Sequence, residues 1–221
     1  MSGLGDAVVV VPGKYLISPG DEPIRQDPDF WYLTGVESPY AILVLAPDRT
    51  AAQNAPRWRS VLFLPTEFQF AGQFPMADSA FRRAPWNRPV RRLVPGAMAQ
   101  AAVRVDATFP VDSFAVRLRQ LAADTRVLYI PTGATLYSPV GLEPPQSYQA
   151  QFAHSIAGIL PDAEVRDVHP LIARLRAVKD DHEIDALRRA AKVAGDGLIE
   201  AMRATRAGLN DREIGGLMEY V

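Results

Sequence analysis

The chain is organised around residues 25–45, RQDPDFWYLTGVESPYAILVL. Residues 30–33 are aromatic or apolar with good strand propensity, and they end at Thr34 and Gly35, where glycine tolerates a positive φ. We therefore expect a short strand at residues 30–33. Residues 41–45 are continuously apolar between two prolines, which is typical of a central strand buried on both faces. The stretch thus predicts two strands of one sheet.

The charged loop ahead of the aromatic run has two interpretations. Arg25, Gln26, Asp27 and Asp29 crowd together around Pro28. Turn chemistry favours a solvated turn in which the proline fixes the backbone, and the alternative is a ligand site. The loop contains no catalytic constellation by itself.

The chain as far as residue 168 alternates between strand and helix patterns. Further strands are predicted at residues 7–11, 60–64, 127–130 and 164–168, and amphipathic helices at residues 110–123 and 144–160. This alternation is typical of an α/β sheet packed by helices. Residues 66–95 carry four prolines spaced too closely for a long helix, so an irregular segment is expected there.

The last forty-odd residues are predicted to be helical. Asp180 and Glu183 have the spacing of a capping box, so one helix should begin there and end at Gly208. Asn210 and Glu213 repeat the arrangement ahead of a second helix. Its apolar stripe reaches the last residue, so we expect the sequence to end inside a helix.

The composition is that of an ordinary globular protein. Of the 221 residues, 48% are hydrophobic and 22% charged, which suits one domain and part of another. The net charge of -1 provides no long-range attraction for a polyanion, so no nucleic-acid partner is expected. Residues 82–92, RRAPWNRPVRR, could contact phosphate and stack a base on Trp86, but a solvated, proline-broken loop is the favoured interpretation.

The absence of cysteine excludes disulfides, thiolate metal sites and a cysteine nucleophile, and it fits a reducing cytosol. The N-terminus lacks a basic region, and its apolar run has only the length of a strand. We therefore expect neither a signal peptide nor a membrane helix, and we expect a cytoplasmic protein without membrane contact.

A search for reactive groups finds no complete active site. His154, His169 and His182 have no second histidine or carboxylate at a spacing such as HExxH, so no metal site is expected. The pair of His182 and Glu183 alone is a weak signal. The chain also lacks a nucleophile elbow, a phosphate-binding loop and a dinucleotide fingerprint.

Two segments carry a family resemblance. Residues 25–45 closely resemble the N-terminal domain fingerprint of Xaa-Pro aminopeptidases (aminopeptidase P) and their creatinase and prolidase relatives in peptidase family M24. KDDHEIDALRRAAKVAGDGLIEAMRATRAGLNDREIGGLMEYV, residues 179–221, resembles the linker helix and first helical hairpin of the family's pita-bread catalytic domain. The resemblance implies a creatinase N-terminal-like, ribonuclease H-like mixed sheet flanked by helices over residues 1–170. Residues 171–221 would then open a truncated catalytic domain.

The resemblance also implies a function for the full-length protein, the removal of an N-terminal residue that precedes proline. Two Asp, one His and two Glu would hold two divalent metal ions, usually manganese, and these ligands would lie beyond Val221. Two such ions can share a hydroxide nucleophile and polarise the scissile carbonyl. This chain alone would be inactive.

In the family, the N-terminal domain serves subunit association and walls a neighbouring subunit's active-site cleft, so a homodimer or higher oligomer is expected. Trp86 falls where the family often has a tryptophan at the lip of that cleft, although Asn87 and Arg88 replace the usual Thr-Gly after it. Two alternatives stay open. One is a creatinase-type or prolidase-type relative, and the other is a non-catalytic association module.

Overall fold

The computed structural model describes residues 5–14, 26–48, 58–66, 93–133 and 147–220. The chain divides into two compact units, Met1–Pro170 and Leu171–Val221. Among the helices in these ranges, none is long and apolar enough to cross a membrane.

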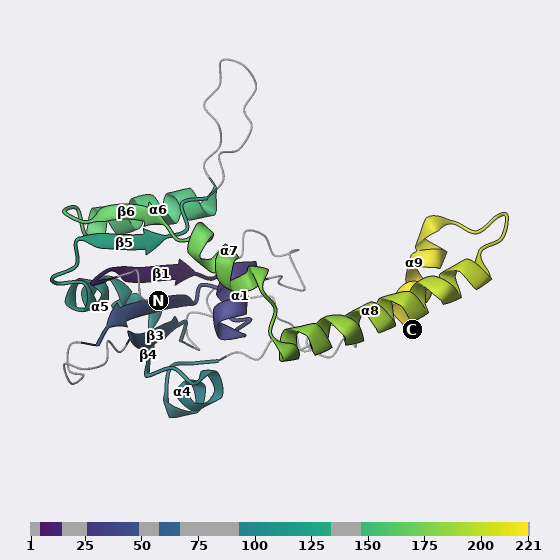
Figure 1. Ribbon diagram of the computed structural model, residues 1–221, viewed down its shortest axis with the longest axis horizontal. Helices are drawn as coiled ribbons and strands as arrows, with labels where there is room; N and C mark the ends of the chain where they lie inside the picture. Colours follow the sequence, from purple (N-terminus) through teal and green to yellow (C-terminus); the bar gives the residue numbers. More distant parts are fainter. Residues whose placement is uncertain (1–4, 15–25, 49–57, 67–92, 134–146, 221) are drawn as a thin grey trace, which may run out of the picture. The chain divides into compact units, whose positions relative to one another are not determined.

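The first unit is built on a mixed six-stranded sheet with the order β4-β3-β2-β1-β5-β6 (Figure 1). The strands are β1 (Val8–Pro12), β2 (Ile42–Pro47), β3 (Trp58–Leu64), β4 (Ala107–Pro110), β5 (Val127–Ile130) and β6 (Glu164–Asp167). Strand β2 is antiparallel to β1 and β3, and the remaining pairs are parallel. The predicted strands are confirmed at five of these positions, including the central position of residues 41–45.

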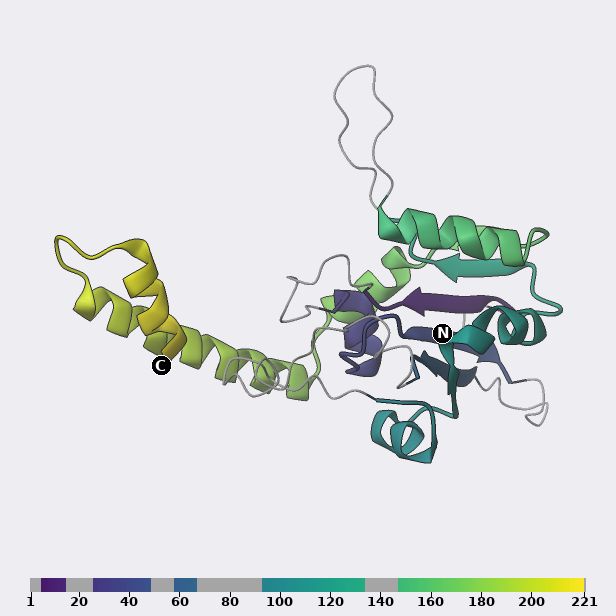
Figure 2. The same ribbon diagram turned by 180° about the vertical axis from the view of Figure 1, so that it is seen from behind.

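Two helices cover one face of this sheet and close the core. They are α5 (Phe114–Leu121) and α6 (Tyr148–Ile159), which confirms the helices predicted at residues 110–123 and 144–160 (Figure 2). Phe114 packs edge-on against Phe63 of β3 with ring centroids 5.1 Å apart, and its centroid lies 6.3 Å from that of Phe152 in α6. The three aromatic rings join both helices to the sheet, because aromatic pairs at these separations bury large apolar areas.

The strand predicted at residues 30–33 is wrong, because these residues belong to helix α1 (Pro28–Thr34). Asp27 caps this helix by accepting hydrogen bonds from two backbone N–H groups of its first turn, and proline occupies the first turn. Gly35 ends it with a φ of 64°, a left-handed conformation that glycine adopts without strain. Signals at both ends therefore outweigh the strand propensity of the aromatic side chains.

Three further elements were not predicted. They are β4, helix α4 (Ala97–Val103) and helix α7 (His169–Ala177), and a short 3-10 turn, Val111–Ser113, precedes α5. Most of the segment expected to be irregular, residues 67–92, lies outside the described residues, so that prediction is not tested.

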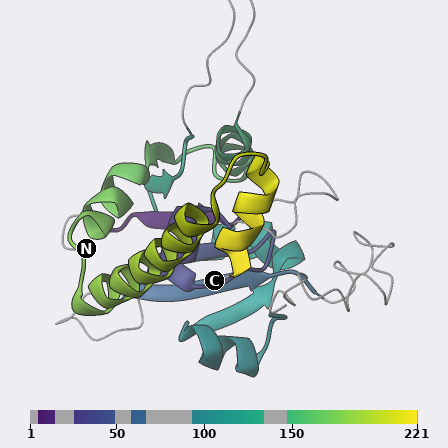
Figure 3. The ribbon, with the colours of Figure 1, turned by 90° about the vertical axis from the view of Figure 1, so that its right-hand side faces the viewer.

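The second unit contains the helical pair α8 (Asp181–Ala204) and α9 (Asp211–Tyr220), with α9 folded back beside α8 (Figure 3). The capping box of Asp180 and Glu183 is confirmed, with both reciprocal hydrogen bonds present. Asn210 and Glu213 exchange the same pair of bonds ahead of α9. Helix α8 ends at Ala204, however, and not at Gly208, which lies in the connecting loop.

Candidate functional site

A group of hydrogen-bonded polar side chains lies at the carboxyl ends of the parallel strands β1, β5 and β6. The residues that follow these strands are hydrogen-bonded to side chains of the loop before α1 and of the end of β6. Helix α1 lies beside this edge of the sheet (Figure 1). In α/β proteins the carboxyl edge of the parallel strands is the usual place for a ligand site. The polar side chains gathered at this edge are therefore the first candidates for a site.

Asp27 is the centre of the cluster. Its Oδ1 atom accepts hydrogen bonds from the backbone N–H groups of Asp29 and Phe30, at 3.0 and 3.1 Å. Its Oδ2 atom accepts from the hydroxyl of Tyr148 at 2.6 Å and from the amide of Gln149 at 3.1 Å. The carboxylate thus joins the start of α1 to the start of α6. Its four partners use most of its capacity as an acceptor, which leaves little for an external ligand.

The solvated turn predicted for this loop is wrong, because Asp27 and Asp29 are only 9% and 6% exposed. The side chain of Gln26 is also used within the fold, because it bonds backbone groups of neighbouring segments. Its Oε1 atom accepts from the backbone N–H groups of Lys14 and Asp27, and its Nε2 atom donates to the carbonyl of Ser38 at 3.0 Å. One amide side chain therefore fixes three backbone segments, and the loop is a folded connector.

His169, the first residue of α7, lies between two carboxylates. Its Nε2 atom is 3.5 Å from Oδ2 of Asp29, and its Nδ1 atom is 3.7 Å from Oδ1 of Asp167. The same Oδ1 atom accepts from the backbone N–H of His169 at 3.2 Å and of Thr132 at 3.4 Å. The histidine side chain is 48% exposed, whereas that of Asp29 is 9% exposed. Sequence analysis missed this grouping, because no short spacing links its members.

The described residues do not form a metal site. No group of three or more His, Cys, Asp or Glu residues in those ranges could hold a metal ion. The two carboxylates at His169 contact opposite nitrogens of one ring, so they do not converge on a common point. His154 lies on α6 and His182 in the first turn of α8. The dinuclear centre implied by the resemblance therefore has no counterpart in the part of the chain that the structure describes.

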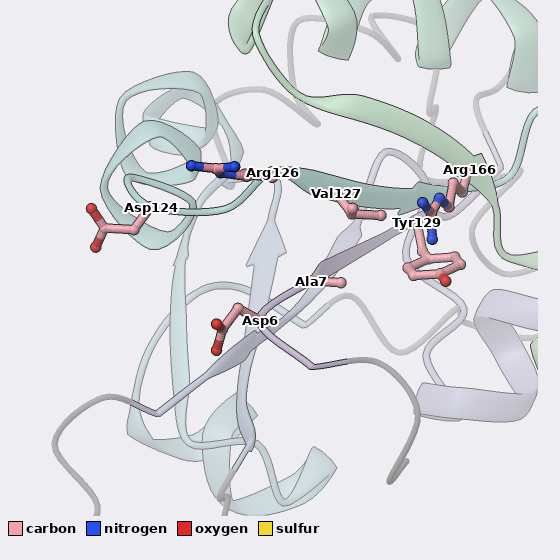
Figure 4. Close-up of a pocket in the computed structure, with 7 residues that line it drawn as sticks. All are labelled: Asp6, Ala7, Asp124, Arg126, Val127, Tyr129 and Arg166. Carbon is pink, nitrogen blue, oxygen red and sulfur yellow. The ribbon is translucent and has the colours of Figure 1, made fainter.

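A hollow of about 310 Å³ opens elsewhere on the first unit, at the starts of β1 and β5 and beside β6 (Figure 4). It is lined by Asp6, Ala7, Asp124, Arg126, Val127, Tyr129 and Arg166. Two carboxylates and two guanidinium groups balance its charge, so it has no strong preference for an anion or a cation.

Arg166 of this hollow is held by an ion pair with a neighbouring carboxylate. Its guanidinium donates to both carboxylate oxygens of Glu164 at 2.9 Å and also bonds Tyr129. These bonds, that to Glu164 above all, raise the pKa of Arg166, and the same pair holds the pKa of Glu164 below its ordinary value. The geometry is that of a bidentate surface ion pair, which fixes the side chain of Arg166 on the exposed strand β6.

Trp86, the residue predicted at the lip of a substrate cleft, lies outside the described residues, and so does the arginine-rich segment around it. The structure therefore does not test either prediction.

These observations define an α/β domain with a mixed six-stranded sheet, whose polar edge is organised by structural hydrogen bonds. The family described as "Aminopeptidase P, N-terminal domain" matches residues 3–129, more than half of the chain. The chain belongs to this family. The family resemblance predicted from residues 25–45 and the α/β fold class are both confirmed.

Characterised proteins extend the similarity beyond residue 129. Xaa-Pro aminopeptidase 3 of Mus musculus is 28% identical over 229 residues, which cover 99% of this chain and 39% of that protein. Xaa-Pro aminopeptidase of Escherichia coli strain K12 is 26% identical over 198 residues, covering 90% of this chain and 40% of that protein. The chain thus spans about two fifths of the length of these relatives.

Solved structures show the same fold. Zinc-substituted E. coli aminopeptidase P in complex with product superposes with a TM-score of 0.69 at 23% identity, over 97% of this chain and 44% of that chain. A putative aminopeptidase P from Bacillus anthracis gives 0.68 at 17% identity, over 97% of this chain and 46% of that chain.

Proposed function

We propose that this chain is the N-terminal part of a Xaa-Pro aminopeptidase-like metallopeptidase, whose full-length form removes an N-terminal residue that precedes proline. One observation carries the proposal: the alignment with the mouse Xaa-Pro aminopeptidase covers 99% of the chain and so includes the second unit as well as the N-terminal domain. A similarity confined to the sheet would support only a shared domain, and domains of one fold serve many functions.

We assign two roles to this chain within the full-length enzyme. It mediates subunit association, and it forms part of the wall of a neighbouring subunit's active-site cleft, with Trp86 at the lip of that cleft. Its chemistry supports a structural role, since Gln26 and Asp27 use their polar atoms on partners within the fold. We place the two divalent metal ions, manganese by resemblance, in the remainder of the full-length protein. A homodimer or higher oligomer, a proline-containing peptide substrate and a cytoplasmic location complete the proposal.

The test is to express the complete reading frame and assay it with manganese on three substrates. These are a tripeptide with proline in second place, a dipeptide that ends in proline, and creatine. We expect release of the first residue from the tripeptide and no hydrolysis by residues 1–221 alone. Preference for the dipeptide or creatine would replace the proposal with a prolidase-type or creatinase-type function.

The association module is distinguished by the sequence that follows Val221. If that sequence lacks the two Asp, one His and two Glu ligands, and the full-length protein oligomerises without hydrolysing any of the three substrates, the catalytic proposal is wrong. Sedimentation of the full-length protein measures the association independently of the hydrolysis assay.

A further inference from the structure

Helix α8 of the second unit has two sides of opposite character. Charged residues on one side form ion pairs within the helix, with N–O distances of 3.3, 2.6 and 2.6 Å for Asp185–Arg188, Lys192–Asp196 and Glu200–Arg203. Spacings of three and four residues place the partners of each pair next to each other on the helix surface. This side of α8 is therefore suited to remain in contact with water.

The other side carries an apolar row at alternating spacings of three and four residues. This row, the α8 stripe, consists of Ile184, Leu187, Ala191, Ala194 and Leu198. Leu187 and Leu198 are 55% and 52% exposed, and the two alanines are exposed as well. A helix of a globular protein packs such a row against other apolar surface. A continuous row left in water is typical of a surface that binds something else.

Helix α9 covers one end of this side of α8. The buried residues of α8 are Gly197 and Ala201. A Cβ atom at Gly197 would lie 3.1 Å from the carbonyl oxygen of Met218 in α9, so the two helices meet there. Leu187 and Ala191, which lie nearer the start of α8, stay exposed.

The position of α9 indicates what covers the rest of the stripe. Helix α9 lies beside α8 and ends at Tyr220, soon after the contact of Met218 with Gly197, so the polypeptide that follows Val221 starts close to the stripe (Figure 3). A segment tethered so near a surface has a high effective concentration there. This chain covers 39% and 40% of the mouse and E. coli relatives, so a full-length protein of their length has ample further polypeptide to supply an apolar partner.

A second copy of the chain is the weaker candidate for the same surface. Two of the five residues of the stripe are alanine, so two stripes that face each other would bury little side-chain area. Stable interfaces between proteins bury roughly 800 Å² on each partner. The stripe is better suited to one part of a larger core than to a separate dimer contact.

We propose that the α8 stripe is a docking surface whose occupant is apolar surface of the polypeptide that follows Val221. The proposal rests on the proposed function only in taking this chain as the N-terminal part of a longer protein, and it does not depend on the reaction assigned to that protein. The distance between packed helices depends on the side chains at their contact, so Ala191 and Ala194 allow the occupant to approach closely. The charged side of α8 stays in solvent.

The test uses the absence of cysteine from residues 1–221, because a single introduced thiol then reports the exposure of one side of α8. Ala191→Cys places the thiol on the stripe, and Arg189→Cys places it about 200° away around the helix, on the charged side. Both variants are made in the 221-residue chain and in the full-length protein. The rate of alkylation by iodoacetamide is measured at each site by mass spectrometry of the peptide, which keeps any cysteine after Val221 separate.

We expect Ala191→Cys to react at least about tenfold more slowly in the full-length protein than in the 221-residue chain, because a buried thiol reacts only when the structure opens. Arg189→Cys should react at rates within about twofold of each other in the two proteins, since its side of the helix stays exposed in both. Leu198→Cys is a second reporter on the stripe and should behave as Ala191→Cys does. All three thiols should react at the same rate in urea, which shows that any difference arises from the folded structure.

Equal rates for Ala191→Cys in the two proteins, or equal protection of Ala191→Cys and Arg189→Cys in the full-length protein, would overturn the proposal. Protection of Ala191→Cys in the 221-residue chain that grows with protein concentration would also overturn it, and would assign the stripe to a second copy. The hydrolysis assay is a separate measurement. A full-length protein that protects Ala191→Cys but hydrolyses none of the three substrates would support the docking surface and refute the proposed function.

Discussion

Replacing Asp27 by alanine tests the central polar contact of the first unit. The substitution removes a helix cap, which costs about 1 kcal/mol. It also removes two hydrogen bonds between side chains and a carboxylate, those from Tyr148 and Gln149, each worth about 1.5 kcal/mol at the low end of the usual range. These terms share one carboxylate and are not additive, so we expect a loss of about 3 kcal/mol in the free energy of unfolding. That is a large fraction of the 5–15 kcal/mol typical of a domain.

The measurement is urea unfolding followed by tryptophan fluorescence. All three tryptophans precede residue 170, so the signal reports the first unit. Asp162→Ala, which removes an exposed carboxylate, should change the free energy by less than about 0.5 kcal/mol. Tyr148→Phe should cost about 1.5 kcal/mol alone and much less when Asp27 is already alanine. A loss below 1 kcal/mol for Asp27→Ala, or full additivity of the two substitutions, would refute the reasoning.

Three further predictions concern the sheet, the helical pair and the surface ion pair. Leu43 is 3% exposed in the central strand β2, so Leu43→Asp should cost several kcal/mol and unfold the first unit, and a soluble variant with an unchanged melting temperature would contradict this. A Cβ atom at Gly197 would lie 3.1 Å from a carbonyl oxygen of α9, whereas one at Gly195 would meet nothing within 4 Å. Gly197→Val should therefore lower the stability of the helical pair by about 1–3 kcal/mol in thermal unfolding, and Gly195→Val should not. An NMR titration should find the pKa of Glu164 below its ordinary value, and the Arg166→Gln variant should bring it back towards that value. Any stabilisation from this pair is therefore present at pH values above the ordinary pKa of Glu164 and is lost as the pH falls through the lowered pKa.

The sheet was predictable because its central strands are buried on both faces. All five residues of β1 are buried, and such strands appear in sequence as unbroken apolar runs. Helices α5 and α6 were predictable for a related reason, since each presents one apolar face to the same core. Strand β4 was missed because it is a four-residue edge strand that ends in proline, so neither a long apolar run nor an alternating pattern marks it.

Helix α1 was mispredicted for a different reason. Its start and end signals are both present in the sequence, but the strand prediction gave more weight to the aromatic side chains between them. Aspartate before proline is a strong start signal for a helix, and the glycine at position 35 is an equally clear end. Over seven residues the aromatic side chains contribute only a small propensity for strand, whereas a cap contributes about 1 kcal/mol. In an element this short, the ends decide the conformation.

The polar cluster could not be predicted from spacing at all. Tyr148 reaches Asp27 across 121 residues of sequence, and the contact exists because α6 follows β5, which pairs with β1 in parallel. His169 meets Asp29 for the same reason, since β6 pairs in parallel with β5 and delivers the start of α7 to the same edge. Parallel pairing brings the residues that follow each strand to one edge of the sheet, so distant side chains meet there. The strand order, which no local pattern contains, is therefore what places a histidine between two carboxylates.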